Sequence, residues 1–197
     1  MKRINKRQNF RAPVLIVCEG YLEDYYFRRL YGLYKRRGGA DEFKFTIICA
    51  DGGSPLRVVE MASEEGPGKY RQRWCVIDVE NSESKMLLKA IALAERQKIS
   101  IALTNPSFDA WALAHLRRLS SNDGPGAREF KDALACEMQR EFSRSGGMDY
   151  ATDILGNECC NLARAADNIS TCDDISVVRQ QIPSTNVHLL TGLLFPP

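Results

Sequence analysis

Acidic residues follow two apolar runs of this sequence, at positions where they could bind a divalent cation together. Glu19 comes directly after the run at residues 14–18, and Asp78 and Glu80 come at the end of the run that begins at Trp74. Continuous apolar runs of this length are typical of parallel strands buried on both faces, whose carboxyl ends lie at one edge of the sheet. Carboxylates gathered there repel one another unless a cation lies between them. The pattern therefore predicts a magnesium-dependent phosphoryl-transfer site.

The acidic pair is the stronger of these two signals. Because side chains alternate along an extended chain, Asp78 and Glu80 should point to the same side, with Val79 turned into the core. The alternative is that the pair caps the next helix or loop, and that Glu19 merely starts a helix, where the dipole favours an acid. Acidic residues that end two separate strands favour the functional interpretation.

Four further residues are candidates for supporting the site. Gly20 allows backbone or substrate to approach closely, and Glu23 follows Glu19 at an interval of one helical turn. Asn105 and Asp109 follow another apolar run, at residues 99–103, and could lie near the same edge of the sheet. Two of them have a structural alternative, since Glu23 could face solvent and Asn105 could cap a helix.

Basic residues suggest where phosphates could bind. Lys85 stands near a predicted helix start, where a cation is disfavoured unless an anion occupies the same place, so it is a candidate phosphate contact. Its alternative is a solvated helix face. Residues 1–12 carry five lysines and arginines and form a basic arm that either contacts phosphates or solubilises the terminus. His115, on an apolar helical face, is predicted to be structural.

Strand and helix patterns alternate along residues 13–119. Apolar runs predict strands at residues 14–18, 43–50, 73–79 and 99–103. Helical spacing predicts helices at residues 22–37 and 108–119. Two further helices are predicted to begin at Pro55, with Ser54 as the cap, and at Ser82 or Ser84. This order predicts an α/β domain with a parallel four-stranded sheet flanked by helices on both faces. Residues 127–197 look mostly helical and are expected to form an extension packed on the same domain.

The composition is compatible with this fold and bears on the binding partners and the cellular location of the protein. A chain of 197 residues with 44% hydrophobic residues can bury an ordinary globular core. Its net charge of +2 is too small to indicate nucleic-acid binding by itself. We expect a cytoplasmic protein without a membrane partner, because no apolar run approaches the length of a signal peptide or membrane span.

The cysteines do not indicate disulfides or zinc. Three of the seven fall within predicted strands, where a thiol behaves as a small hydrophobe: Cys18, Cys49 and Cys75. Three others, with a histidine further on, lack the paired spacing that zinc sites show: Cys159, Cys160 and Cys172, with His188. The metal prediction therefore rests on carboxylates alone.

The motifs occur in a recognisable order along the chain. They are Val14 to Gly20 with Glu23, then Asp78-Val79-Glu80, then Thr104 to Trp111 with the sequence TNPSFDAW, and finally Ile182 to Leu190. In this order they resemble the RloB family, which belongs to the Toprim-like group, and the last stretch looks like the closing segment of that family. The resemblance implies a Toprim-like Rossmannoid sheet with a magnesium site built from Glu19, Asp78 and Glu80. Toprim proteins commonly carry two aspartates where this chain has Asp78 and Glu80, which leaves the number and geometry of the metal ions open.

Two functional hypotheses follow. The first is a metal-dependent endonuclease that cleaves RNA or DNA with Mg²⁺, or with Mn²⁺ in its place, and uses Glu19 as a general acid or base. The resemblance places such a protein beside an AAA-type or ABC-type ATPase in bacterial restriction and phage abortive-infection systems, by analogy only. The second hypothesis is a non-catalytic adaptor or sensor that binds nucleic acid or the ATPase. A homo-oligomer is compatible with both.

Overall fold

The computed structural model describes most of the chain between the two ends. The described residues are 13–37, 44–66, 68–80, 84–156 and 161–194. The predicted basic arm at residues 1–12, the helix stop at Gly38-Gly39, and the cysteines Cys159 and Cys160 lie outside the described residues.

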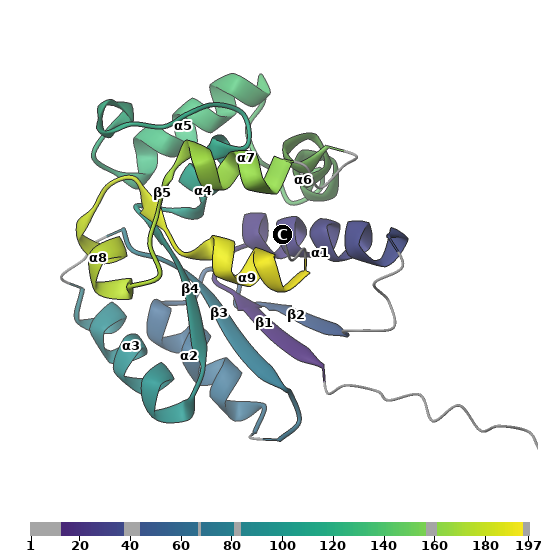
Figure 1. The fold of residues 1–197 in the computed structure, drawn as a ribbon, viewed down its shortest axis with the longest axis vertical. Helices are drawn as coiled ribbons and strands as arrows, with labels where there is room; N and C mark the ends of the chain where they lie inside the picture. The colour runs from purple at the N-terminus through teal and green to yellow at the C-terminus, as the bar shows by residue number, and fades with distance from the viewer. Residues whose placement is uncertain (1–12, 38–43, 67, 81–83, 157–160, 195–197) are drawn as a thin grey trace, which may run out of the picture.

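The core of the fold is a sheet in which four neighbouring strands run parallel, as the sequence predicts (Figure 1). These strands are β1 (Val14–Cys18), β2 (Phe45–Cys49), β3 (Gln72–Asp78) and β4 (Ser100–Asn105), in the order β2-β1-β3-β4. Cys18, at the end of β1, lies opposite Val76, so β3 continues two residues further to Asp78. The residues after β1 and the last residues of β3 therefore meet at the carboxyl edge.

The sheet is larger than the four strands predicted, and it is mixed. The short strand β6 (Ser184–Thr185) pairs antiparallel with β4, and β5 (Ser170–Thr171) pairs parallel with β6. Strands of two residues are too short to produce a hydrophobic period in the sequence. The side chain of Asn186 extends the pairing, because its Oδ1 accepts the N–H of Leu103 at 2.5 Å and its Nδ2 donates to the carbonyl of Ile101 at 2.9 Å.

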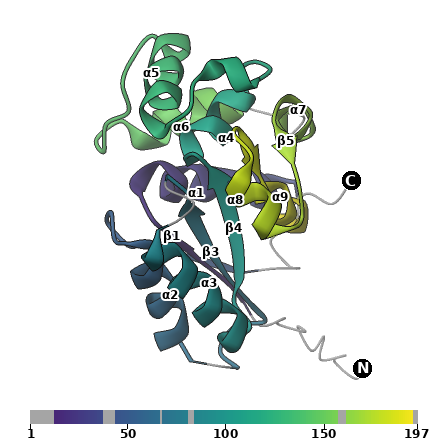
Figure 2. The ribbon, with the colours of Figure 1, turned by 90° about the vertical axis from the view of Figure 1, so that its left-hand side faces the viewer.

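Helices cover both faces of the sheet. On one face lies α1 (Tyr21–Arg36), and on the other lie α2 (Pro55–Glu64) and α3 (Lys85–Gln97), side by side (Figures 1 and 2). Alternate residues of β1 enter two separate clusters, with Ile16 packed on the α1 side and Leu15 on the α2 and α3 side. This alternation explains why the run at residues 14–18 is apolar throughout.

Helix starts follow local rules that the sequence shows. Ser54 caps α2 by accepting the N–H of Arg57, and Pro55 occupies the first helical position, as predicted. Helix α3 begins after Ser84. Helix α4 (Phe108–Ala114) is shorter than the predicted 108–119, and a turn of 3-10 helix follows at Ser121–Asp123.

The residues beyond 119 are mostly helical, as predicted. They form α5 (Ala127–Met138), α6 (Gly147–Leu155), α7 (Asn161–Asn168), α8 (Ile175–Gln180) and α9 (Val187–Leu194). Helix α6 packs on α1, and α5 packs on α4, so these helices enlarge the core on the α1 side of the sheet. Figure 1 shows α4, α5 and α6 beyond the carboxyl ends of the parallel strands, where they can contribute to a site at that edge.

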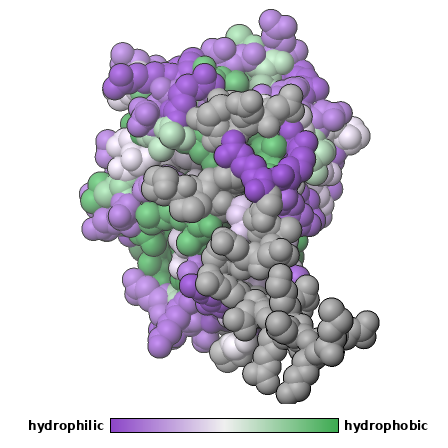
Figure 3. All heavy atoms as spheres, turned by 45° about the vertical axis from the view of Figure 1, so that its right-hand side comes forward, coloured by the Kyte–Doolittle hydropathy of each residue, from purple (hydrophilic) through white to green (hydrophobic). Residues whose placement is uncertain are grey.

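The surface is largely polar over these added helices. On the face shown in Figure 3, hydrophilic side chains cover much of the upper part of the molecule, which holds α5, α6 and α7 (Figure 1). Ion pairs such as Arg140 with Asp153 lie in this region. Among the residues described, no helix has the length and apolar character needed to cross a membrane.

Candidate functional site

Glu19 is the first residue after β1, and it is turned toward the end of β3. Its backbone N–H donates to the carbonyl of Val76 at 3.1 Å, which continues the pairing of the two strands. Its Oε2 accepts the backbone N–H of Asp78 at 3.1 Å. The two predicted acids are therefore neighbours, and the Glu19 carboxylate is held in place by a hydrogen bond.

Asp78 is the last residue of β3 and connects this strand to the start of α4. Its Oδ1 accepts the backbone N–H of Phe108 at 2.8 Å. Since a helix begins with N–H groups that lack partners within the helix, a carboxylate is a favourable acceptor there. Asp78 thus occupies a fixed position between the ends of β3 and β4.

Glu80 lies beyond the end of β3, in a turn. Its backbone has φ = 40°, a left-handed conformation that is uncommon for residues other than glycine. The N–H of Glu80 donates to the carbonyl of Pro106 at 2.8 Å, and Val79 between the acids is only 3% exposed. Val79 therefore faces the core as predicted, and the exposed Glu80 reaches the same pocket as Asp78.

Two of the predicted supporting residues join this acidic group. Glu23, in the first turn of α1, is only 5% exposed, and Asp109 in α4 accepts the hydroxyl of Ser107 at 3.2 Å. Gly20 leaves room for Glu23, because a Cβ atom at Gly20 would lie 2.9 Å from Glu23 Oε2. The close approach expected at Gly20 is therefore made by the neighbouring carboxylate.

Burial and mutual repulsion oppose the ionisation of these acids. Burial raises the pKa of Glu19 to about 7, with a further contribution from the charge of Glu80. Burial also raises the pKa of Glu23 to about 8, and the charges of Glu19 and Asp109 add to the effect. The pKa of Asp78 is raised well above its ordinary value, first by burial and then by Glu23 and Glu19. Burial raises the pKa of Asp109 as well. A cation at this edge would stabilise the ionised forms.

Two other predicted residues, Asn105 at the carboxyl end of β4 and Lys85, are not among the described residues that line the pocket around Glu19, Asp78 and Glu80. Asn105 is 3% exposed, and its Nδ2 donates to the carbonyls of Val178 at 3.0 Å and Arg179 at 2.9 Å, so it holds α8 against the end of β4. Lys85 is the exposed first residue of α3. Its contact with phosphate stays a prediction.

The acids open into a shallow pocket of about 550 Å³, which we call the acidic pocket. Its walls come from four segments of the chain. The lining residues are Glu19, Gly20, Tyr21, Leu22, Glu23, Gly52, Asp78, Glu80, Phe142, Ser143 and Arg144. The last three belong to the segment between α5 and α6, within the part of the chain that the sequence predicts to be mostly helical; no motif or spacing in this segment indicates a position at the sheet edge.

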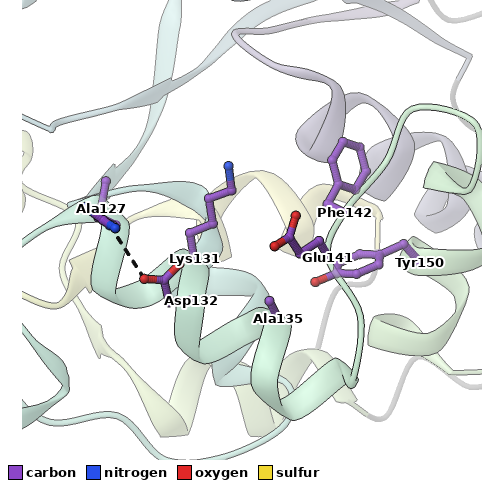
Figure 4. Close-up of a pocket in the computed structure, with 8 residues that line it drawn as sticks. Ala127, Lys131, Asp132, Ala135, Glu141, Phe142 and Tyr150 are labelled. Atoms are coloured by element: carbon purple, nitrogen blue, oxygen red, sulfur yellow. Dashed lines mark ion pairs between the residues drawn. The ribbon is translucent and has the colours of Figure 1, made fainter.

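A second pocket, of about 420 Å³, lies between α5 and α6. Figure 4 shows Lys131, Glu141 and Tyr150 around one space, with Phe142 at its side. Phe142 also lines the acidic pocket, so this residue is shared by the two hollows. Burial, with a contribution from Asp109, raises the pKa of Tyr150 to about 12, which keeps its hydroxyl protonated.

His115 is structural, as predicted. It is fully buried, and its Nε2 lies 3.1 Å from the hydroxyl of Tyr26, which in turn accepts Trp111 Nε1–H at 2.9 Å. Burial lowers the pKa of His115 to about 3, so the ring is neutral. This network joins α1 to α4.

In the part of the chain that the structure describes, no three histidine, cysteine, aspartate or glutamate side chains already converge closely enough to hold a metal ion. One oxygen of Glu19 and one of Asp78 are engaged by backbone N–H groups. Of the three predicted metal ligands, Glu80 is the exposed one, so its side chain has room to turn toward Glu19 and Asp78.

Comparison with known proteins identifies the family. A family model described as RloB-like protein matches residues 14–194, which is most of the chain, and this confirms the resemblance seen in the motifs. No curated protein and no solved structure gives a significant match to the chain.

Proposed function

The chain belongs to the RloB-like family, and we propose that it is a Mg²⁺-dependent nuclease that hydrolyses phosphodiester bonds of RNA or DNA. The observation that carries the proposal is the position of Glu19, Asp78 and Glu80 around one open pocket at the carboxyl edge of a parallel sheet. The analogy that places RloB-like proteins beside an ATPase in anti-phage and restriction-associated systems supplies the biological setting of the proposal.

The donor set of the pocket fits magnesium. Mg²⁺ prefers carboxylate oxygens and usually keeps several of its water ligands, so one or two firmly held carboxylates are enough to position it. The hydrogen bonds from the amides of Asp78 and Phe108 fix the orientation of Glu19 and Asp78. Glu80 would complete the set, and Mn²⁺, which also accepts oxygen ligands, is expected to replace Mg²⁺.

The residues of the pocket have separate tasks in this proposal. When bound, Mg²⁺ would stabilise the negative charge that develops on the phosphate and help to activate water. Glu19, with a pKa of about 7, can accept or release a proton near neutral pH. Glu23 lines the same pocket, and a bound cation would favour the ionised forms of Glu23 and of its neighbour Asp109.

The adaptor hypothesis has one observation in its favour. Glu19 and Asp78 already have backbone partners, and these bonds alone give both residues a role in joining β1, β3 and α4. A non-catalytic RloB-like protein would use the same edge to bind nucleic acid or an ATPase. Its binding would survive Asp78→Asn and would need no metal.

The test is a cleavage assay with matched variants. Purified protein is incubated with labelled RNA, plasmid DNA and single-stranded DNA in Mg²⁺, in Mn²⁺ and in EDTA. Glu19→Gln and Asp78→Asn retain the oxygens that accept the amides of Asp78 and Phe108, so both variants should fold normally. Glu95→Gln, on the exposed face of α3, is the control.

The nuclease proposal expects metal-dependent cleavage by the wild type and Glu95→Gln that is lost in the two pocket variants. Cleavage that persists in folded Glu19→Gln or Asp78→Asn would refute the assignment. Binding without cleavage, unchanged in Asp78→Asn and in EDTA, would support the adaptor instead.

A further inference from the structure

Arg144 belongs to the part of the helical extension that lines the acidic pocket. It lies between α5 and α6, and its Nη2 is 2.7 Å from Oδ1 of Asp51, a residue just after β2. Its guanidinium also lies over the ring of Tyr21, the first residue of α1, at 3.9 Å from the ring centroid. Three distant segments of the chain therefore meet at the rim of the pocket.

The charge of Arg144 differs from that of the other lining residues. Among the described residues that line the pocket, four are carboxylates and Arg144 alone carries a positive side chain. A phosphodiester that approaches the pocket is repelled by the carboxylates, and a cation at the rim would offset this repulsion. A planar guanidinium is well suited to the task, because it can donate two parallel hydrogen bonds to phosphate oxygens.

The present partners of Arg144 allow it to bind a ligand. The Arg144 side chain is 66% exposed and that of Asp51 is 58% exposed. Ion pairs so open to water contribute little to stability, so a phosphate can displace Asp51 at little cost. The Tyr21 ring keeps the guanidinium at the rim while its partner changes, since a cation is attracted to the face of an aromatic ring.

We propose that Arg144 forms a phosphate-binding subsite at the rim of the acidic pocket. It takes a backbone phosphate of a nucleic-acid strand, next to the phosphate that faces the carboxylates. Asp51 competes for the same guanidinium and so limits the affinity of the subsite. The proposal rests on the proposed function in one respect only, namely that the ligand of the pocket is a nucleic acid.

Binding is measured by fluorescence anisotropy with short labelled single strands of RNA and of DNA. One arm uses EDTA, which prevents metal-dependent cleavage, and the other uses the Glu19→Gln background with Mg²⁺. The variants are Arg144→Gln, Asp51→Asn and, as the matched control, Arg140→Gln. Arg140 lies in the same segment between α5 and α6, pairs with Asp153 and has its guanidinium carbon 5.3 Å from the Tyr150 ring centroid, but it does not line the acidic pocket.

Arg144→Gln should weaken binding roughly tenfold at low salt, because a hydrogen-bonded charge is lost. It should also reduce the slope of log affinity against log salt by about 0.7, the value for one phosphate of a single strand. Asp51→Asn should strengthen binding, whereas the double variant should behave like Arg144→Gln. Arg140→Gln should stay close to the wild type.

Equal losses in Arg144→Gln and Arg140→Gln would overturn the subsite, as would an Asp51→Asn variant that binds no more tightly than the wild type. Absence of binding to both RNA and DNA in both arms would overturn it too. The subsite and the nuclease proposal can fail separately. Arg144-dependent binding by a protein that cleaves nothing would refute the nuclease, and cleavage that ignores Arg144 would refute the subsite.

Discussion

The carboxylate of Asp78 accepts the backbone N–H of Phe108 at 2.8 Å, so a candidate metal ligand also holds the first turn of α4. This double role allows charge and hydrogen bonding to be separated by mutation. Asp78→Asn keeps the acceptor and removes a buried negative charge, whereas Asp78→Ala removes both.

We expect Asp78→Asn to be at least as stable as the wild type in EDTA, because burial and its acidic neighbours disfavour the ionised carboxylate. Asp78→Ala should be less stable than Asp78→Asn by about 1 to 3 kcal/mol, the cost of leaving the Phe108 N–H without its partner. Urea unfolding of the three proteins gives the comparison. Equal stability of the alanine and asparagine variants would mean that the hydrogen bond does not support α4.

Glu23 should make the metal-free protein less stable as the pH rises. Its pKa is about 8 in the folded state and 4.5 without the fold, so the folded protein retains the proton more strongly. The stability from this group is complete below pH 4.5 and is lost as the pH rises through 8. The free energy of unfolding should therefore fall between about pH 6.5, above which histidine contributes little, and about pH 8.5.

The measurement is urea unfolding in EDTA across this range, with a limit of about 1.4 kcal/mol per pH unit for each proton. Glu23→Gln should flatten the fall, and the exposed Glu95→Gln should leave it as it is. A fall of the same steepness in Glu23→Gln would show that another group is responsible, with Glu19 as the next candidate.

Outside the acidic pocket, substitution of Asn186 should be among the changes that lower the stability of the fold most. Its side chain is 2% exposed and bonds both the N–H of Leu103 and the carbonyl of Ile101. Asn186→Ala leaves two buried backbone groups of β4 without partners and should lower the free energy of unfolding by about 2 to 5 kcal/mol. Asn122→Ala, at an exposed position, is the control. If Asn186→Ala lowered the free energy of unfolding no more than Asn122→Ala does, the Asn186 side chain would not be an important partner of the β4 backbone.

Lys85 and Lys89 provide a matched pair on α3. Both are exposed, but Lys85 lies at the first position of the helix, near the carboxyl edge of the sheet, and Lys89 lies one turn further away. If Lys85 contacts phosphate, Lys85→Ala should weaken nucleic-acid binding and reduce its salt dependence, while Lys89→Ala should do neither. Identical behaviour of the two variants would assign Lys85 to the solvated face of the helix.

The parallel part of the sheet could be predicted because its strands are buried on both faces and therefore apolar along their whole length. The end of α4 could not. Apolar residues continue the helical spacing to Leu119, but the helix ends at Ala114. The carbonyls of Ala114 and His115 accept hydrogen bonds from Asn168 and Arg164. These residues of α7 lie about fifty positions away, so local spacing carries no sign of them.

The acidic half of the pocket could be predicted for the same reason, since parallel topology brings the residues after β1 and β3 together. The other half could not. Phe142 and Arg144 reach the edge because α6 packs on α1, which positions the preceding segment over Tyr21. The partner of Arg144 is 93 residues away in the sequence, and neither residue belongs to a recognisable motif.

The small strand β6 affects how the protein is made. It pairs with β4, and the Asn186 side chain that follows it reaches Leu103 across 83 residues of sequence. During synthesis, β4 therefore leaves the ribosome long before its second partner does, and its outer edge stays exposed in the meantime. An exposed edge invites pairing with other chains. A nascent chain halted before residue 184 should thus require chaperones, and the sheet that carries the acidic pocket is completed only when the last part of the described chain has emerged.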